Sequence, residues 1–459
     1  MANIVWCLPQ FALGTGALTQ NLFPGMSKHL AAGSILLVAV IVVWFYNSGS
    51  KGIQIFEIIL KVMVGIVVLC FFGVVIALTF TENPADKLPW GDIFSGLIPD
   101  FTRLFKPVPS LEPAIAATGA HAQWWSDSIA ELQRDKIITA FATAVGINMT
   151  FLLPYSMLRK GWGKPHRGLA IYDLSIGLIV PFVLATACVV IAAASQFHGN
   201  GTPSTSGKSQ GSYNSFLDKR LAEEFGDDFK SLQANVKAAP DEATKTAATT
   251  ALQAKRDALS EADRALAAMM AERDNQDLAL TLEPLTGKQV AQKVFGIGVL
   301  GMAVSTVIIL MLINGFAFCE AIGKPANGNW HRIGSLIPAI GVVGPFYWAK
   351  AAPALATPTS VLGGAMLPIA YVTFLLLMNS KSLLGDAMPR GGRRIIWNVL
   401  MIIATLIASF TSVWGMWSKT YTTSSGGSIP AGKIGIAILA ALLVVGVIGF
   451  IRNSAKPKA

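Results

Sequence analysis

Apolar stretches long enough to cross a lipid bilayer recur along this chain, separated by short polar segments. A window of about 19 residues finds ten candidate spans, at 3–22, 30–47, 53–79, 136–158, 169–195, 293–319, 333–349, 361–378, 395–417 and 433–451. The first span is diluted by polar residues and has no Lys or Arg before it, so we interpret it as a span facing other helices rather than a signal peptide. The pattern predicts an all-α integral membrane protein with about ten transmembrane helices.

The composition agrees with that class. Hydrophobic residues make up 53% of the chain and charged residues only 14%, with a mean hydropathy of +0.54. The formal net charge is +10, but most basic residues flank apolar spans, where they set topology rather than bind nucleic acid. The four cysteines lie in or beside apolar spans without metal-ligand spacing. Since no hydrolase, kinase or zinc-protease motif occurs, we expect neither an enzyme nor a bound cofactor.

Lys and Arg are concentrated in the short loops on one side of the predicted bundle. The strongest cluster follows the fourth span and contains Arg159, Lys160, Lys164 and Arg167. The positive-inside rule therefore predicts that both termini are cytoplasmic. We expect a multi-pass protein of the cell (inner) membrane.

Residues 199–290 differ in kind from the rest and divide the predicted bundle into 1–198 and 291–459. They hold a large share of the charged residues and begin with a Gly/Ser/Thr linker. Apolar residues then recur at helical spacing, at Leu217, Leu221, Phe225, Phe229 and Leu232 and later at Leu252, Leu259 and Leu266. This pattern predicts an extracytoplasmic helical hairpin that packs on itself, with a coiled coil to a protein partner as the alternative.

The other long segment on the same side is 81–135. It contains several prolines together with Trp90, Trp124 and Trp125. Tryptophan is enriched at membrane–water interfaces. We therefore expect a partly ordered loop on the membrane surface, with these indoles as interfacial anchors.

The fourth span carries a polar interruption. Gly146, Ile147, Asn148, Met149 and Thr150 lie within it, and Pro154 follows. An unpaired backbone group in lipid costs several kcal/mol, so a broken helix persists only against protein or a water-filled site. Transporters place substrate sites at such breaks. The alternative for Asn148 is a hydrogen bond between helices.

Ionisable residues inside the spans are few. Glu57 and Lys61 are spaced to pair on one helix face near the cytoplasmic end of the third span. Asp173 and Glu320 lie near the ends of the fifth and sixth spans. None is at mid-membrane depth, so no carboxylate is an obvious ligand for a cation or a proton relay.

The broken span and its successor, ATAVGINMTFLLPYSMLRKGWG and LAIYDLSIGLIVPFVLATACVVIAAASQF, resemble the sixth and seventh helices of the Nramp divalent-metal transporter family. KGIQIFEIILKVMVGIVVLCFF is similar to its fifth helix and INGFAFCEAIG to the end of its eighth, while residues 366–403 resemble its tenth and eleventh. The resemblance covers nearly all the membrane portion but not 199–290. It implies the inverted-repeat architecture of the leucine transporter.

The resemblance also shows departures. In this register Met1 lies at the family's third helix, so the first two helices, including the metal-binding DPGN motif, have no counterpart here. The family's MPHN positions fall on Gly146, Ile147, Asn148 and Met149, or one residue later, and its tenth-helix glutamine is Met366. A lost thioether would weaken a preference for transition metals over magnesium.

We therefore expect a secondary transporter for a divalent cation such as Mn²⁺, Fe²⁺ or Mg²⁺, moving it across the lipid bilayer. The expected metal-binding residues are Thr143, Ala144, Gly146, Asn148 and Met149, with main-chain carbonyls from the first two. Two alternatives remain: an organic-solute carrier of the same fold, and a truncated, non-transporting membrane scaffold whose insert binds a partner.

Overall fold

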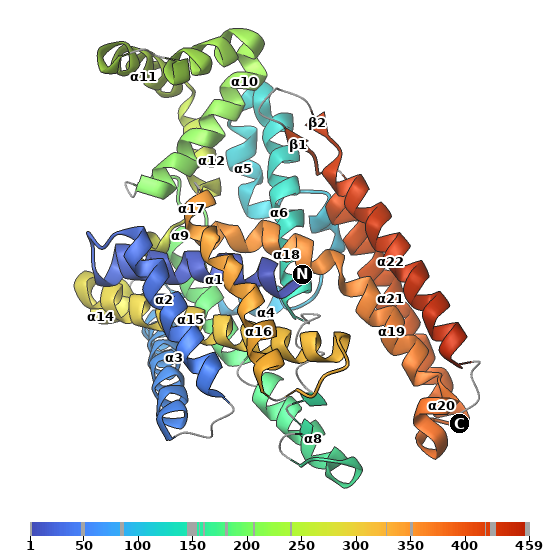
Figure 1. The fold of residues 1–459 in the computed structure, drawn as a ribbon. Helices are drawn as coiled ribbons and strands as arrows, with labels where there is room; N and C mark the ends of the chain where they lie inside the picture. Colours follow the sequence, from blue (N-terminus) through green and yellow to red (C-terminus); the bar gives the residue numbers. More distant parts are fainter. Residues whose placement is uncertain are drawn as a thin grey trace.

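The molecule is almost entirely helical (Figure 1). The computed structural model describes residues 2–46, 51–82, 87–144, 154–155, 157–158, 161–179, 182–204, 207–238, 241–326, 328–348, 352–417, 419–422 and 428–454. Within these ranges the strands are two short ones, β1 (Tyr421–Thr422) and β2 (Ser428–Ile429), paired antiparallel. The helical class is therefore confirmed.

Five described helical stretches are long and apolar enough to cross a membrane: Lys28–Phe45, Lys288–Ala321, Ala352–Met378, Gly392–Trp417 and Ala431–Arg452. Each coincides with a predicted span. Two shorter apolar helices, Val64–Thr79 and Val183–Phe197, fall in two more. The other predicted spans consist of shorter pieces or lie partly outside the described residues, so the count of ten stays a prediction.

The centre of the bundle is α15 (Lys288–Ala321), whose apolar side chains are mostly buried. It packs against α1 (Ala2–Gly16), α2 (Lys28–Phe45), α3 (Lys51–Thr79) and α16 (Asn329–Leu336). Phe11, Ile35, Val307 and Met311 form part of their shared core. Small residues allow the close approach that membrane helices need in the absence of a hydrophobic driving force.

The path of α1 continues into a π-helical segment, η1 (Ala17–Leu22). The short helices α13 (Asn275–Ala279), η9 (Leu280–Leu282) and α14 (Glu283–Thr286) lie against this end of the bundle. The Nδ2 of Asn275 donates to the Leu13 carbonyl at 3.1 Å, and the Nδ2 of Asn21 donates to the Asn275 carbonyl at 3.0 Å. Lys293 Nζ donates to the Leu22 carbonyl at 2.7 Å. The end of the first helix is thus closed by polar contacts from far along the chain.

The predicted insert forms α10 (Gly207–Ala238), α11 (Glu242–Asp257) and α12 (Glu261–Met270), at the top of Figure 1. Asp241 and Ser260 cap the last two helices by accepting hydrogen bonds from the amides of Thr244 and Asp263. The hydrogen bonds that Asp241 accepts, first from the Thr244 amide and then from the Thr244 hydroxyl, lower its pKa because they stabilise the charged carboxylate. α10 packs against α11 and α12, as the hairpin prediction expects.

The insert also packs against the chain that precedes α6 (Ala122–Ala144), namely η4 (Pro109–Leu111) and α5 (Glu112–Ala116). Leu217, Leu221 and Leu266 share one core with Ile129 and Trp125. The prediction that Trp125 is an interfacial anchor is therefore wrong. Its ring is fully buried, and Nε1 donates to Asp263 Oδ1 at 2.7 Å.

Two buried ion pairs join the same helices. Arg220 lies 3.4 Å from Asp263 and 2.9 Å from Glu224, and Arg256 donates two hydrogen bonds to Asp218 at 2.8 and 2.9 Å. A buried charge without its partner is costly. These pairs therefore fix how α10 docks on its neighbours.

The C-terminal helices form a separate layer, drawn in orange and red in Figure 1. It consists of α19 (Leu367–Met378), α20 (Lys381–Leu384), α21 (Gly392–Trp417) and α22 (Ala431–Ser454). Asn379 and Asn398 exchange hydrogen bonds at 2.8 and 3.0 Å across α19 and α21. Reciprocal amide pairs of this kind hold membrane helices in register.

Candidate metal-transport site

The structure tests only part of the predicted site. Thr143 and Ala144 are the last described residues of α6. Gly146, Asn148 and Met149 lie outside the described residues, so the expected break of the fourth span stays a prediction. The site must be located from the elements that surround α6.

α6 is fixed against α18 (Ala356–Ala365). Lys136 Nζ donates to Thr357 Oγ1 at 2.7 Å. Further along, Ile138 and Val361 both border Gly415 of α21. These contacts place the second half of α6 beside α18; Ala144 is eight residues beyond Lys136, and Ala365 is eight residues beyond Thr357.

The helix that begins with α18 is interrupted just there. Met366 separates α18 from α19, and Pro368 lies in the first turn of α19. Proline lacks the N–H that would donate to the carbonyl four residues earlier, so it suits a helix start and breaks a continuous helix. The Ala365 carbonyl at the break instead accepts from Ser412 Oγ at 3.0 Å. This interruption falls at Met366, the residue that the resemblance aligns with the family's tenth-helix glutamine.

Among the described residues, buried polar atoms without a hydrogen-bond partner occur on both α18 and α1, which pack together. Ser360 is fully buried, and its Oγ has no hydrogen-bond partner in the part of the chain that the structure describes. The same holds for Trp6 Nε1 and Gln10 Oε1, one turn apart on α1. Gly363 admits the Trp6 ring, because a Cβ at Gly363 would lie only 2.6 Å from it. Buried polar atoms normally have partners, so this seam has unused hydrogen-bonding capacity.

Sequence reasoning missed this seam. It attributed Gln10 and Thr15 only to helix contacts and did not single out Ser360. The available signal was the polar residues in two otherwise apolar spans. What could not be read from the sequence is that α1 and α18 are neighbours.

The other ionisable positions lie elsewhere. Tyr155, in the described part of the fourth span, is hydrogen-bonded to Glu320 and stacks on Phe316, with ring centroids 4.9 Å apart. Phe316 in turn meets His331 edge-on at 4.6 Å. Tyr155 thus joins the described part of the fourth span to the end of α15, and Phe316 joins α15 to α16. The contact between Tyr155 and Glu320 agrees with a structural role for Glu320 at the end of a span.

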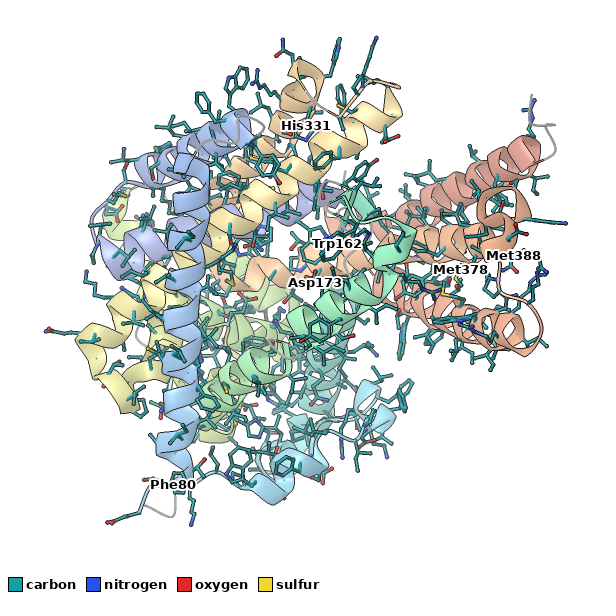
Figure 2. All side chains as sticks on the ribbon, turned by 90° about the horizontal axis from the view of Figure 1, so that it is seen from below. Phe80, Trp162, Asp173, His331, Met378 and Met388 are labelled. Atoms are coloured by element: carbon teal, nitrogen blue, oxygen red, sulfur yellow. The ribbon has the colours of Figure 1, made fainter. Side chains whose placement is uncertain are left out.

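Asp173 belongs to α8 (Arg167–Leu174) and is exposed. Figure 2 shows it on the underside of the molecule, apart from His331. The Glu57 side chain lies outside the described residues, so its pairing with Lys61 is untested. Asp173 lies on α8 and Glu320 at the end of α15, so the two residues come from different helices.

No group of three or more His, Cys, Asp or Glu side chains gathers as a metal cage among the described residues. The elements around α6 and α18 offer carbonyl, hydroxyl, amide and thioether groups instead. Oxygen ligands suit hard cations, and thioether sulfur suits softer ones. Such a set can bind a cation in transit, which must also be released.

Comparison with known proteins gives one match. Residues 260–418 match the family model described as "Natural resistance-associated macrophage protein-like". No curated protein and no solved structure matches the chain. The resemblance is therefore confirmed for the region from α12 to α21, which contains Glu320, the α18–α19 interruption and Ser412.

The match corrects one boundary. It begins at Ser260, inside the segment 199–290 that the resemblance was expected to leave out. The physical reason is that the last part of this segment is not a separate hairpin. α13, η9 and α14 pack on α1, α3 and α15 and belong to the membrane bundle.

Proposed function

Because residues 260–418 are Nramp-like, and that family transports metal ions, we propose that this chain is a secondary transporter for a divalent cation. The observation that supports this most directly is the helix interruption at Met366. It lies inside the matched region. It also follows α18, which packs against α6, and α6 ends four residues before Asn148. Interrupted helices at membrane depth are where secondary transporters bind their cargo.

We assign the cation site to the space between the end of α6 and this interruption. The carbonyls of Thr143 and Ala144, the chain at Gly146, and the side chains of Asn148 and Met149 would line one wall. Met366 and the α18 carbonyls would line the other. Two thioethers in such a set would favour Mn²⁺ or Fe²⁺ over Mg²⁺.

The proposed topology follows the basic residues. Both termini would be cytoplasmic, and α10, α11 and α12 would lie on the opposite side of the cell membrane.

The test is flux into proteoliposomes loaded with a metal-sensitive dye. We expect Mn²⁺ entry with the unaltered chain and a fall of roughly tenfold with Asn148→Ala, since one lost ligand is worth about 1.4 kcal/mol. The matched control is Asn200→Ala, whose exposed side chain accepts from the Thr202 amide and donates to the Gln196 carbonyl, both within four residues of it in the chain. Flux of radiolabelled amino acids without any metal flux would refute the proposal and favour an organic-solute carrier.

A further inference from the structure

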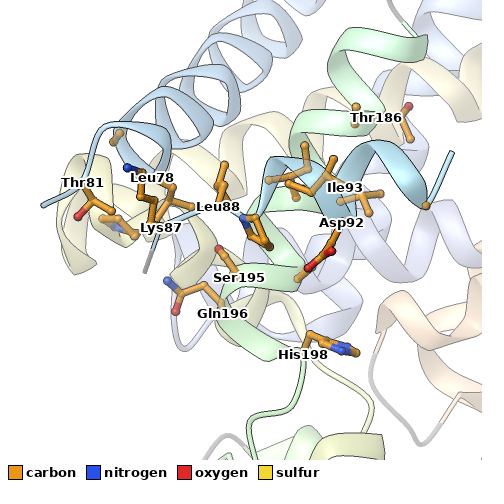
Figure 3. A pocket seen from close by; sticks show the side chains of 18 of the residues that line it. Leu78, Thr81, Lys87, Leu88, Asp92, Ile93, Thr186, Ser195, Gln196 and His198 are labelled. Carbon is orange, nitrogen blue, oxygen red and sulfur yellow. The ribbon is translucent and has the colours of Figure 1, made fainter. Parts of the chain in front are cut away.

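A long cavity of about 940 Å³ opens where the ends of α3 and α9 (Ala187–Phe197) meet the short helix α4 (Trp90–Ser95) (Figure 3). It lies at the side of the bundle that carries the insert and is separate from the proposed cation site. The cavity has two chemically different ends.

One wall is apolar and follows α9 and the helical turn before it. Val183, Ala187, Val190 and Ala194 line it, and Ile93 and Leu97 form part of the opposite wall. Val183 and Val190 are 55% and 58% exposed. From Val183 to His198 the helix extends about 20 Å, which exceeds the roughly 15 Å hydrocarbon depth of one leaflet.

The other end is polar. Ser195, Gln196 and His198 come from the end of α9, and Figure 3 shows them below Leu88 and Asp92. Lys87 and Asp92 carry opposite charges, and Figure 3 shows them on different sides of the cavity, Lys87 beside Thr81 and Asp92 above His198. His198 is held by a hydrogen bond between Nε2 and Ser110 Oγ at 3.0 Å. A lysine beside an apolar wall matches the phosphate of a lipid headgroup on an alkyl chain.

The chain next to the cavity indicates that this region meets lipid. Phe94, Leu97, Ile98, Phe101 and Phe105 are between 62% and 75% exposed. They belong to short helical turns and their connections rather than to a membrane-crossing helix. Exposed apolar patches of this kind mark interaction sites, and beside the ends of two apolar helices the matching surface is the bilayer interface.

We propose that this groove binds a phospholipid of the leaflet on the insert side, with one acyl chain along α9 and its phosphate at Lys87. A soluble anion would leave the apolar wall empty, and a peptide would leave its backbone groups without partners against Val183 and Val190.

The test uses the full chain in nanodiscs that contain a photoreactive phosphatidylethanolamine with the reactive group on its acyl chain. We expect cross-links to peptides containing residues 183–198. Val190→Trp fills the groove and should lower labelling about tenfold, an effect equivalent to about 1.4 kcal/mol. Val189→Trp, on the neighbouring residue that does not line the cavity, should leave labelling unchanged.

The headgroup is tested separately. Lys87→Gln should weaken competition by unlabelled phosphatidylethanolamine severalfold, about 1 kcal/mol for one charged contact, whereas Lys106→Gln, outside the cavity, should not. Equal labelling of the Val190→Trp and Val189→Trp proteins would refute the proposal. So would a groove occupied by a peptide in native mass spectra. Thermal unfolding of each variant shows whether it is folded, and none of these readouts depends on metal flux.

Discussion

Two interrupted helices in the described part of the bundle differ in how the main-chain carbonyls at their breaks are bonded. At α1–η1, Asn275, Gln276 and Lys293 donate from other elements to the carbonyls of Leu13, Gln20 and Leu22. At α18–α19, Ser412 donates to the Ala365 carbonyl. Buried side-chain oxygens without a partner among the described residues occur at both breaks, on Thr15, Gln20 and Asn21 at the first and on Ser360 at the second.

This contrast separates a structural joint from a candidate binding site. Both breaks have the same origin, a departure from regular helical hydrogen bonding at membrane depth. A break alone is therefore a weak indicator of function. The difference lies in how many main-chain carbonyls at the break accept hydrogen bonds from side chains of other described elements, three at the first and one at the second.

The largest expected effect is at the closed joint. Asn275→Ala removes the donor to the Leu13 carbonyl from a fully buried position, and we expect a loss of about 2–3 kcal/mol in unfolding free energy. Denaturant unfolding in detergent measures it. Gln276→Ala, which removes an exposed bond to the Gln20 carbonyl, should cost under about 0.5 kcal/mol. Equal losses of unfolding free energy in the two variants would contradict the structural role of Asn275 at this joint.

The next effect is at Ser412. Ser412→Ala leaves the buried Ala365 carbonyl without its donor, at an expected cost of about 2 kcal/mol. Ser305→Ala is the matched control, because Ser305 bonds only within its own helix at an exposed position. Thermal unfolding of both variants decides whether this contact holds the α18–α19 break in place.

Pro368→Ala tests the break itself. The new N–H can donate to the carbonyl four residues earlier and straighten the helix, so we expect roughly tenfold lower metal flux with no loss of stability. Pro345→Ala, in the first turn of α17 (Gly344–Tyr347), is the control. If the Pro368→Ala helix is straight and metal flux is unchanged, the break is not part of the transport site.

The smallest effect is expected at Ser360. Its hydroxyl is buried without a partner among the described residues, so Ser360→Ala should stabilise the protein by about 0.5–1 kcal/mol. Thr359→Ala is the comparison, because that hydroxyl bonds the Leu355 carbonyl at 2.8 Å. A clear loss of unfolding free energy in Ser360→Ala would mean that the Ser360 hydroxyl has a hydrogen-bond partner in the folded protein.

The sequence predicted the helical membrane class, the insert's helices and the family resemblance, because hydrophobic periodicity and Lys/Arg placement are local signals. It did not predict which distant segments meet. Trp125 has the composition of an interfacial anchor but bonds Asp263, which is 138 residues away. Likewise, α13 looks like part of a polar insert, and only its contacts with α1 and α15 place it in the bundle.

The length of α6 has a mechanical consequence. This helix has 23 residues, about 34 Å, and its first turns pack in the hydrophobic core that Trp125 shares with α10 and α12. Its far end leads to the proposed cation site. A bound protein that tilted α10 would therefore tilt the same stiff helix, and the insert would act on the proposed cargo path from a distance.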